Sequence, residues 1–305
     1  MTTEPSVLLF FIDGLGIGKR VPENPLNAPN LAPLAVFQEE SPERFLDGLV
    51  VPTDACLGVE GRPQSASGQT TILTGVNAPA AVGYHKQGFP NKALLEIIQE
   101  YSVFKQLKEA GVTPVTFANA YTGRFFTERP RWVSATTAAV EAAQMSFRTV
   151  ADLRADNAVF MDFTNRLLIE RGEDVAPRTE REAAAVLAKI THEHRFTLYE
   201  YFITDKVGHA QDSRMADIVL RSLSLFIREL LGLLDLTRTT VILVSDHGNI
   251  EDLSLRNHTL NKVPTIIWGA NREQIAKGIG SLTDITPSIV GVLTENLTSN
   301  VAISN

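Results

Sequence analysis

The sequence predicts an α/β protein with a doubly wound, mostly parallel sheet flanked by helices. Five continuous apolar runs lack the alternation of a half-exposed strand, so we expect strands that are buried on both faces. The runs are SVLLFFID (6–13), VTPVTFAN (112–119), TLYEYFITD (197–205), TTVILVSD (239–246) and VPTIIWG (263–269). Segments with helical periodicity lie between them, and this alternation of strand and helix is typical of a parallel sheet.

The predicted helices carry start or stop signals. Residues 91–111 have an amphipathic pattern that ends at a glycine, a common stop. Residues 179–194 begin with Thr179 and Glu182 at the spacing of a capping box. Residues 214–235 repeat apolar side chains near helical spacing.

Two segments fit this alternation poorly. Residues 14–60 are rich in proline and are expected to be mostly loops. Residues 122–178 have helical patterns but no strong apolar run. We therefore expect a core made of residues 1–121 and 179–305, with residues 122–178 as a small inserted cap.

Composition excludes several classes of function. A net charge of −7 leaves no basic excess to bind nucleic acid. No apolar run approaches the length of a membrane span, and the first residues lack the basic region of a signal peptide, so we expect a cytoplasmic protein without a membrane partner. Cys56 is the only cysteine, which excludes a disulfide framework and a cysteine-based zinc site. The oligomeric state is left open.

Acidic residues end three of the predicted strands. These residues are Asp13, Asp205 and Asp246. In open α/β sheets the carboxyl ends of the strands form the ligand-binding edge. One such aspartate could simply cap a turn, but three at one edge would repel each other unless cations joined them.

Three of the six histidines lie close to these aspartates in the sequence. His247 follows Asp246 directly, His209 lies four residues after Asp205, and His258 lies eleven residues after His247. A combination of imidazole and carboxylate suits zinc, manganese or iron. A lone histidine is usually structural, but this grouping favours a metal site.

A candidate nucleophile lies in PQSASGQTTILTG (63–75). The segment is typical of a turn that leads into a helix, whose N-terminus favours an anion. Ser65, Ser67, Thr70 and Thr71 are all candidates for a metal-activated hydroxyl, and their types and positions do not decide among them. A capped turn rich in hydroxyls is the alternative.

Taken together, the motifs resemble the alkaline phosphatase superfamily of metalloenzymes, and most closely its branch of cofactor-independent phosphoglycerate mutase and phosphopentomutase. The matching segments are FIDGLGIG (11–18), NAPNLAPLA (27–35), SASGQTTILTG (65–75), TDKVGH (204–209), SDHGNIED (245–252), NHTLNKVPTIIWG (257–269) and LTDITPSIVGVL (282–293). The resemblance implies an alkaline phosphatase-like fold and two divalent metal ions, Mn²⁺ or Zn²⁺.

The resemblance also implies the role of each motif residue. One metal would be held by Asp13, Ser65, Asp246 and His247, and the other by Asp205, His209 and His258. The nucleophile of the family lies ten residues before a motif glycine, here Gly75, which selects Ser65.

The chain departs from the mutases in two ways. Gln69 stands where they have a histidine after the motif glycine, and the inserted segment is much shorter than that of the phosphoglycerate mutases. The substrates of the mutases are therefore not carried over.

We expect a two-metal phosphoryl-transfer enzyme that forms a phosphoserine on a small anionic phosphoester. The short insertion favours hydrolysis, with a phosphomutase acting on a phosphosugar or phosphoglycerate as the alternative. A non-catalytic metal-binding protein with the same fold is the alternative of another class. Basic side chains near the motifs are candidates to bind the substrate, although each could be an ordinary surface charge; they are Arg62, His85, Lys86 and Lys206.

Overall fold

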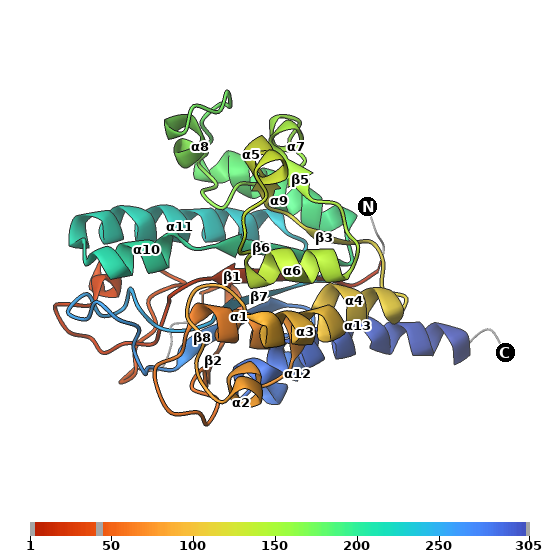
Figure 1. Ribbon diagram of the computed structural model, residues 1–305, viewed down its shortest axis with the longest axis horizontal. Coiled ribbons are helices and arrows are strands. Elements are labelled where there is room, and N and C mark those ends of the chain that lie inside the picture. Colours follow the sequence, from red (N-terminus) through yellow and green to blue (C-terminus); the bar gives the residue numbers. More distant parts are fainter. Residues whose placement is uncertain (1–3, 41–44, 303–305) are drawn as a thin grey trace.

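A six-stranded sheet forms the centre of the computed structural model, which describes residues 4–40 and 45–302 (Figure 1). The strands are β1 (Ser6–Ile12), β2 (Leu49–Thr53), β3 (Val115–Phe117), β6 (Phe196–Tyr201), β7 (Thr239–Ser245) and β8 (Val263–Gly269). Their order across the sheet is β2-β8-β7-β1-β6-β3. The four strands β7, β1, β6 and β3 are parallel, whereas β8 runs antiparallel to both of its neighbours.

Strand β1 shows why this sheet must be covered on both faces. Leu8 and Phe10 belong to one buried apolar cluster, whereas Val7 and Leu9 belong to another. Successive side chains of a strand point to opposite faces, so both clusters lie against the sheet, one on each side. The predicted doubly wound, mostly parallel sheet flanked by helices is confirmed.

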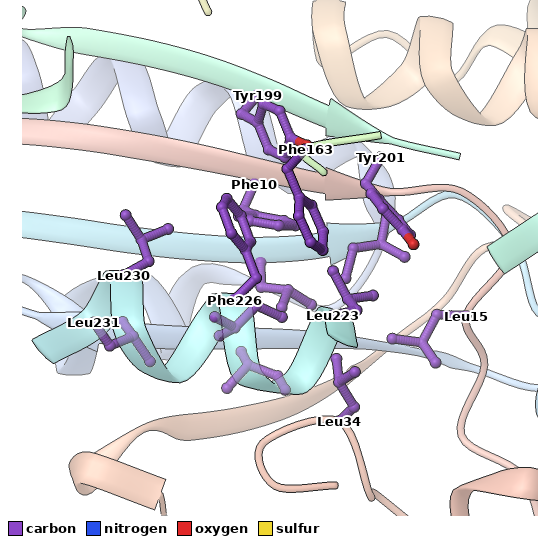
Figure 2. Packing of buried hydrophobic residues seen from close by; sticks show 14 of the residues in the cluster. Phe10, Leu15, Leu34, Phe163, Tyr199, Tyr201, Leu223, Phe226, Leu230 and Leu231 are labelled. Carbon is purple, nitrogen blue, oxygen red and sulfur yellow. The ribbon is translucent and has the colours of Figure 1, made fainter. Parts of the chain in front are cut away.

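Helices cover the two faces of the sheet. The longer ones are α1 (Ser65–Thr74), α3 (Lys92–Tyr101), α4 (Val103–Glu109), α6 (Ala135–Ala142), α9 (Glu180–Glu193), α10 (Ile203–Ala210), α11 (Ser213–Leu233), α12 (Arg272–Gly278) and α13 (Ile285–Ala302). Helices α9 and α11 bury their apolar residues in the cluster that includes Phe10, and α1, α4, α6 and α13 bury theirs in the other. Figure 2 shows Phe226 of α11 below Phe10, with its ring stacked on that of Phe163 at a centroid distance of 4.2 Å.

Short elements make up most of the remaining chain. They are α2 (Ala78–Val82), α5 (Gly123–Thr127), α7 (Val150–Arg154), α8 (Arg166–Glu170), the 3₁₀ turns Pro25–Asn27, Phe45–Asp47 and Leu282–Asp284, and a second sheet of β4 (Ala120–Tyr121) and β5 (Arg148–Thr149). Within the described residues, no helix combines the length and apolar character that crossing a bilayer requires.

Several elements differ from their predicted extents. The helix predicted at 91–111 is two helices, because Ser102 between α3 and α4 has a non-helical backbone and its buried hydroxyl donates to Ala139 O. Of the strand predicted at 112–119, only residues 115–117 form a strand, which is β3. Strand β2 lies in the segment predicted to be loops; it is an edge strand, where its proline, Pro52, is tolerated.

The inserted segment 122–178 divides into two parts. Helix α6 packs with α1 and α3 over the sheet, and its Ala135 and Ala139 belong to the same apolar cluster as Val7 and Leu9. Residues around α7 and α8 bury a small cluster of their own, which includes Phe160 and Leu168. In Figure 1, α5, α7 and α8 lie at one end of the molecule, beyond α9. The boundaries of the cap stay a prediction.

Candidate metal and phosphoryl-transfer site

Polar side chains gather where the parallel strands end. Asp13 directly follows β1, and Asp246 directly follows the adjacent strand β7. Both aspartates are buried, as is His247. The α1 N-terminus brings Ser65 to the same place, since Ser65 is the first residue of that helix.

The prediction that Asp205 ends a strand is wrong. Strand β6 stops at Tyr201, and Asp205 lies in the first turn of α10. An apolar run alone does not show where a strand gives way to a helix. The helix begins so soon after the strand that Asp205 still reaches the same edge, where the Thr204 hydroxyl donates to Asp13 O at 2.5 Å.

Around His247, the first group of predicted metal ligands comes together. Its Nε2 lies 2.9 Å from Ser65 Oγ, 3.1 Å from Asp13 Oδ1 and 3.6 Å from Asp246 Oδ2. These residues come from three separate segments of the chain. The structure thus assembles the four residues that the resemblance assigns to one metal.

Around Asp205, the second group forms. Asp205 Oδ1 lies 3.5 Å from His209 Nε2 and 3.4 Å from His258 Nε2. Ligand atoms of these three residues lie within 4.8 Å of one another, and the same holds for Asp13, Asp205 and His247. Asp205 therefore joins the two groups into one site.

The two histidines of the second group are oriented by backbone carbonyls. His209 Nδ1 contacts Arg256 O and His258 Nδ1 contacts Pro63 O, each at 2.8 Å. A Nδ1–H that donates to a carbonyl leaves Nε2 as the lone-pair atom. The two Nε2 atoms face each other at 3.1 Å, an arrangement that needs a cation or a proton between the lone pairs.

Electrostatics also favour cations here. Burial raises the pKa of the Asp13 and Asp246 carboxyls, and the nearby charge of Asp205 raises the pKa of both further. Burial alone would lower the pKa of His247, but Asp246 and Asp13 raise it to about 10. Among the described residues, the His247 ring 3.1 Å away is the group that reaches the buried Asp13 Oδ1. Three carboxylates and converging imidazoles fit divalent cations.

Gln69 takes part in this arrangement. Its Nε2 donates to Asp13 Oδ2 at 3.1 Å and to Asp246 Oδ2 at 3.2 Å. The departure from the mutase motif therefore places a neutral amide between two carboxylates of the site. The amide offsets part of their repulsion without adding a charge.

The structure distinguishes the four candidate hydroxyls. Thr70 Oγ1 donates to Ala66 O, and Thr71 Oγ1 donates to Ser67 O. Ser67 is buried, and its hydroxyl accepts from the backbone N–H of Lys86 at 3.0 Å. Ser65 is the one whose hydroxyl contacts His247, so geometry supports the residue that the family spacing selects. Its role as nucleophile stays a prediction.

The four basic candidates lie in different surroundings. Arg62 donates to His258 O, next to the second group of ligands. Burial and the charge of Arg171 lower the pKa of Lys206, which follows Asp205. His85 Nε2 instead contacts Val59 O in the loop before α1, and Lys86 Nζ donates to Gln87 O, so these two side chains are engaged with backbone carbonyls. Their role in substrate binding stays a prediction for all four.

Sequence reasoning missed Glu251. Its carboxylate is buried and accepts four hydrogen bonds, which tie together the three loops that carry Asp13, Asp246 and His258. The donors are Gly16 N (2.9 Å), Asn249 N (2.7 Å), Thr259 Oγ1 (2.5 Å) and Asn261 Nδ2 (3.0 Å).

Two glycines leave room for the Glu251 carboxylate. Any side chain at position 16 or 248 would collide with it, since a Cβ at either position would lie 2.1 Å from Oε1. Glu251 lies inside SDHGNIED, so the signal was present, but nothing in that motif separates it from the metal-capable residues.

We expect Glu251→Gln to destabilise the protein by roughly 2–4 kcal/mol, because an amide group would face hydrogen-bond donors in a buried place. Turnover should fall as well, since the three loops lose their common acceptor. Urea unfolding of both proteins measures the first effect. The neighbouring substitution Asp252→Asn is a matched control, because Asp252 is less buried and, among the residues that the structure describes, its side chain bonds only within its own turn. An unchanged unfolding midpoint for Glu251→Gln would contradict this role.

A parallel sheet whose carboxyl edge gathers acidic and imidazole side chains defines a class of metal-binding α/β proteins. The family model for the metalloenzyme superfamily matches residues 133–296, which is more than half of the chain. The chain belongs to the metalloenzyme superfamily.

Comparison with individual proteins supports this assignment. A 2,3-bisphosphoglycerate-independent phosphoglycerate mutase from Methylobacillus flagellatus is 26% identical over 122 residues, which cover 38% of this chain but only 23% of the mutase. The structure of the PH0037 protein from Pyrococcus horikoshii has a TM-score of 0.55 at 13% identity, covering 96% of this chain and 98% of that one. A cold-active alkaline phosphatase from Shewanella sp. has a TM-score of 0.50 at 9% identity, covering 94% and 99%. At these identities the structural likeness concerns the fold, and the expected alkaline phosphatase-like fold is confirmed.

Proposed function

We propose that this protein is a metal-dependent phosphatase that cleaves a small anionic phosphoester through a phosphoserine at Ser65. The observation that carries the proposal is the position of Ser65 Oγ, 2.9 Å from His247 at a helix N-terminus, beside three carboxylates. Membership of the metalloenzyme superfamily and the partial match to a phosphoglycerate mutase support phosphoryl transfer. The net charge of −7 supports a small substrate rather than nucleic acid.

The residues that would hold metals follow from the two groups. Asp13, Ser65, Asp246 and His247 would hold one divalent ion, and Asp205, His209 and His258 the other. When bound, such ions lower the pKa of a hydroxyl and offset the negative charge of phosphoryl oxygens. The mixed oxygen and nitrogen ligands suit manganese or zinc.

The proposed reaction has two steps, transfer of the phosphoryl group to Ser65 and hydrolysis of the phosphoserine. The α1 N-terminus and the basic side chains near it attract the phosphoryl group to Ser65. Ser65 Oγ forms a bond to phosphorus while the bond from phosphorus to the ester oxygen breaks, and the proton that Ser65 loses balances the one that the departing alcohol gains. Water then attacks the phosphoserine, the bond from phosphorus to Oγ breaks, one proton of the water returns to Ser65 Oγ, and inorganic phosphate leaves.

The small inserted segment favours water as the acceptor. A mutase must keep water away while its phosphorylated form returns the phosphoryl group to the same substrate, which favours a large closing lid. Here α5, α7 and α8 are each five residues long.

Incubation with phosphosugars and phosphoglycerates, followed by assays of free phosphate and of isomers, tests the proposal. We expect phosphate release without isomer formation. Isomer formation without phosphate release would make the protein a mutase. Metal binding without either product from any substrate would favour the non-catalytic alternative.

Removal of metals should abolish turnover. Because three carboxylates and the facing imidazoles need cations between them, we expect dialysis against EDTA to inactivate the protein and added Mn²⁺ or Zn²⁺ to restore it. Elemental analysis before and after dialysis gives the metal content. Full activity in protein without bound transition metal would contradict the assignment.

A further inference from the structure

We propose that the alcohol part of the substrate carries an aromatic ring, and that a pocket between the inserted segment and the carboxyl edge of the sheet binds this ring. This inference rests on the proposed phosphatase function and adds the class of substrate to it. The pocket has a volume of about 360 Å³, a size suited to a small ligand. Six aromatic side chains line it, and we call it the aromatic pocket: Phe89, Tyr121, Phe125, Trp132, Phe160 and Phe202.

The aromatic pocket lies next to the candidate site, and its lining includes residues that neighbour the predicted ligands in the chain or in the sheet. Lys206, which lines the pocket, directly follows the predicted ligand Asp205. Glu200, on another wall, lies in β6 opposite Phe11 of β1, two residues before Asp13. Phe89 belongs to the loop whose backbone bonds to Ser67 in the nucleophile helix. A phosphoester at Ser65 can therefore extend its alcohol part into the pocket.

The walls are mostly apolar, and some of their rings pack against one another. Trp132 is 55% exposed and Phe89 49% exposed, although both are large side chains that gain from burial. The ring of Tyr121 packs against that of Phe125 at 4.5 Å, and its hydroxyl bonds to Thr137 Oγ1 at 2.7 Å. A flat ring entering this space would cover exposed aromatic surface without reordering these side chains.

The polar groups of the pocket are arranged for a ring rather than for a sugar. The Asn119 side chain forms two hydrogen bonds with the backbone of Glu200. Its Nδ2 donates to Glu200 O at 2.8 Å, and its Oδ1 accepts from Glu200 N at 3.0 Å. Ser134 Oγ and Tyr121 Oη both bond to Thr137. Hydroxyl groups of a sugar would compete with these bonds, whereas an aromatic ring leaves them intact.

Two basic side chains also line the aromatic pocket and can attract an anionic phosphoester. Lys206 and Arg171 both line the pocket, and neither forms an ion pair within 4.0 Å in the part of the chain that the structure describes. The combination of paired cations and aromatic walls matches a phosphomonoester with an arylalkyl or heteroaromatic alcohol.

A matched pair of substrates isolates the contribution of the ring. Ethyl phosphate and 2-phenylethyl phosphate are both esters of primary alcohols, so the basicity of the leaving group is similar and the ring is the main difference. We expect kcat/KM to be about tenfold or more higher for 2-phenylethyl phosphate. Trp132→Ala and Phe125→Leu should reduce this ratio several-fold. Leu225→Ala, which removes an exposed apolar side chain from α11, should leave the ratio unchanged. Circular dichroism shows whether each variant is folded.

Binding without turnover separates this inference from the proposed function. Ser65→Ala protein in Mn²⁺ is titrated by calorimetry with ethylphosphonate and with 2-phenylethylphosphonate, whose P–C bonds are not hydrolysed. We expect the phenyl compound to bind about tenfold more tightly and to change tryptophan fluorescence, with the change absent in Trp132→Phe. Equal affinities would overturn the aromatic pocket, even if the protein is a phosphatase. A clear ring preference in binding, together with no turnover of either ester by the unmodified protein, would overturn the phosphatase and leave the pocket.

Discussion

Replacement of Ser65 by alanine is expected to stop turnover and to prevent any phosphorylated protein from forming. The reason is that Ser65 presents its hydroxyl to His247 beside the carboxylates, while the neighbouring hydroxyls bond to backbone groups. Mass spectrometry of protein quenched during turnover locates the phosphate. We expect Ser65→Thr to keep a little activity, since it retains a hydroxyl and adds only a methyl group.

Nearby hydroxyls provide the control. Ser67→Ala and Thr71→Ala should keep much of the activity and lose about 0.5–1.5 kcal/mol of stability, because Ser67 Oγ accepts from Lys86 N and Thr71 Oγ1 accepts from Ala78 N, two bonds that hold loops against α1. A phosphate on Ser67 or Thr70, or an active Ser65→Ala protein, would overturn the choice of Ser65. Neither result would change the assignment of the two groups of metal ligands.

Loss of a carboxylate from the first group should have the second largest effect. Asp246→Asn keeps the shape of the side chain but removes a charge beside Ser65, and we expect turnover to fall on the order of a hundredfold or more, as is common even for residues that only support a metal ligand. His209→Ala should have a similar effect through the second group. Both variants should remain folded, because the two residues lie at the edge of the sheet, beyond its apolar core. Metal content and circular dichroism distinguish a lost ligand from a lost fold. Turnover equal to that of the unmodified protein in both variants would show that the ligand assignment is wrong.

The sequence predicts the sheet well because buried parallel strands leave continuous apolar runs. It predicts the position of Asp13 and Asp246 for the same reason, since each follows such a run directly. It fails at Asp205, where the run TLYEYFITD contains both the end of a strand and the start of a helix. The break at Ser102 also leaves no local signal, because its hydroxyl bonds to a carbonyl of the distant α6.

The supporting parts of the site are harder to predict. Glu251 accepts hydrogen bonds from residues far away in the chain, and no spacing rule links Gly16 to Asn261. The aromatic pocket has the same origin: Phe89, Tyr121 and Phe202 come from separate segments, and tertiary packing alone brings them together. The choice of Ser65 among four hydroxyls depended on the family spacing, not on the chemistry of the segment.

The position of β1 in the sheet has a consequence for the way in which the chain folds. The first strand of the chain lies between strands from its second half, with Val7 paired to both Phe196 and Thr240. Such long-range pairing makes folding slow, and it leaves the apolar β1 without partners while the ribosome is still producing the middle of the protein. His258 emerges later still, so the complete set of metal ligands exists only after β1, β6 and β7 have all been synthesised. We therefore expect metal loading to follow the formation of the sheet rather than to guide early folding, and the nascent chain to depend on chaperones that cover β1.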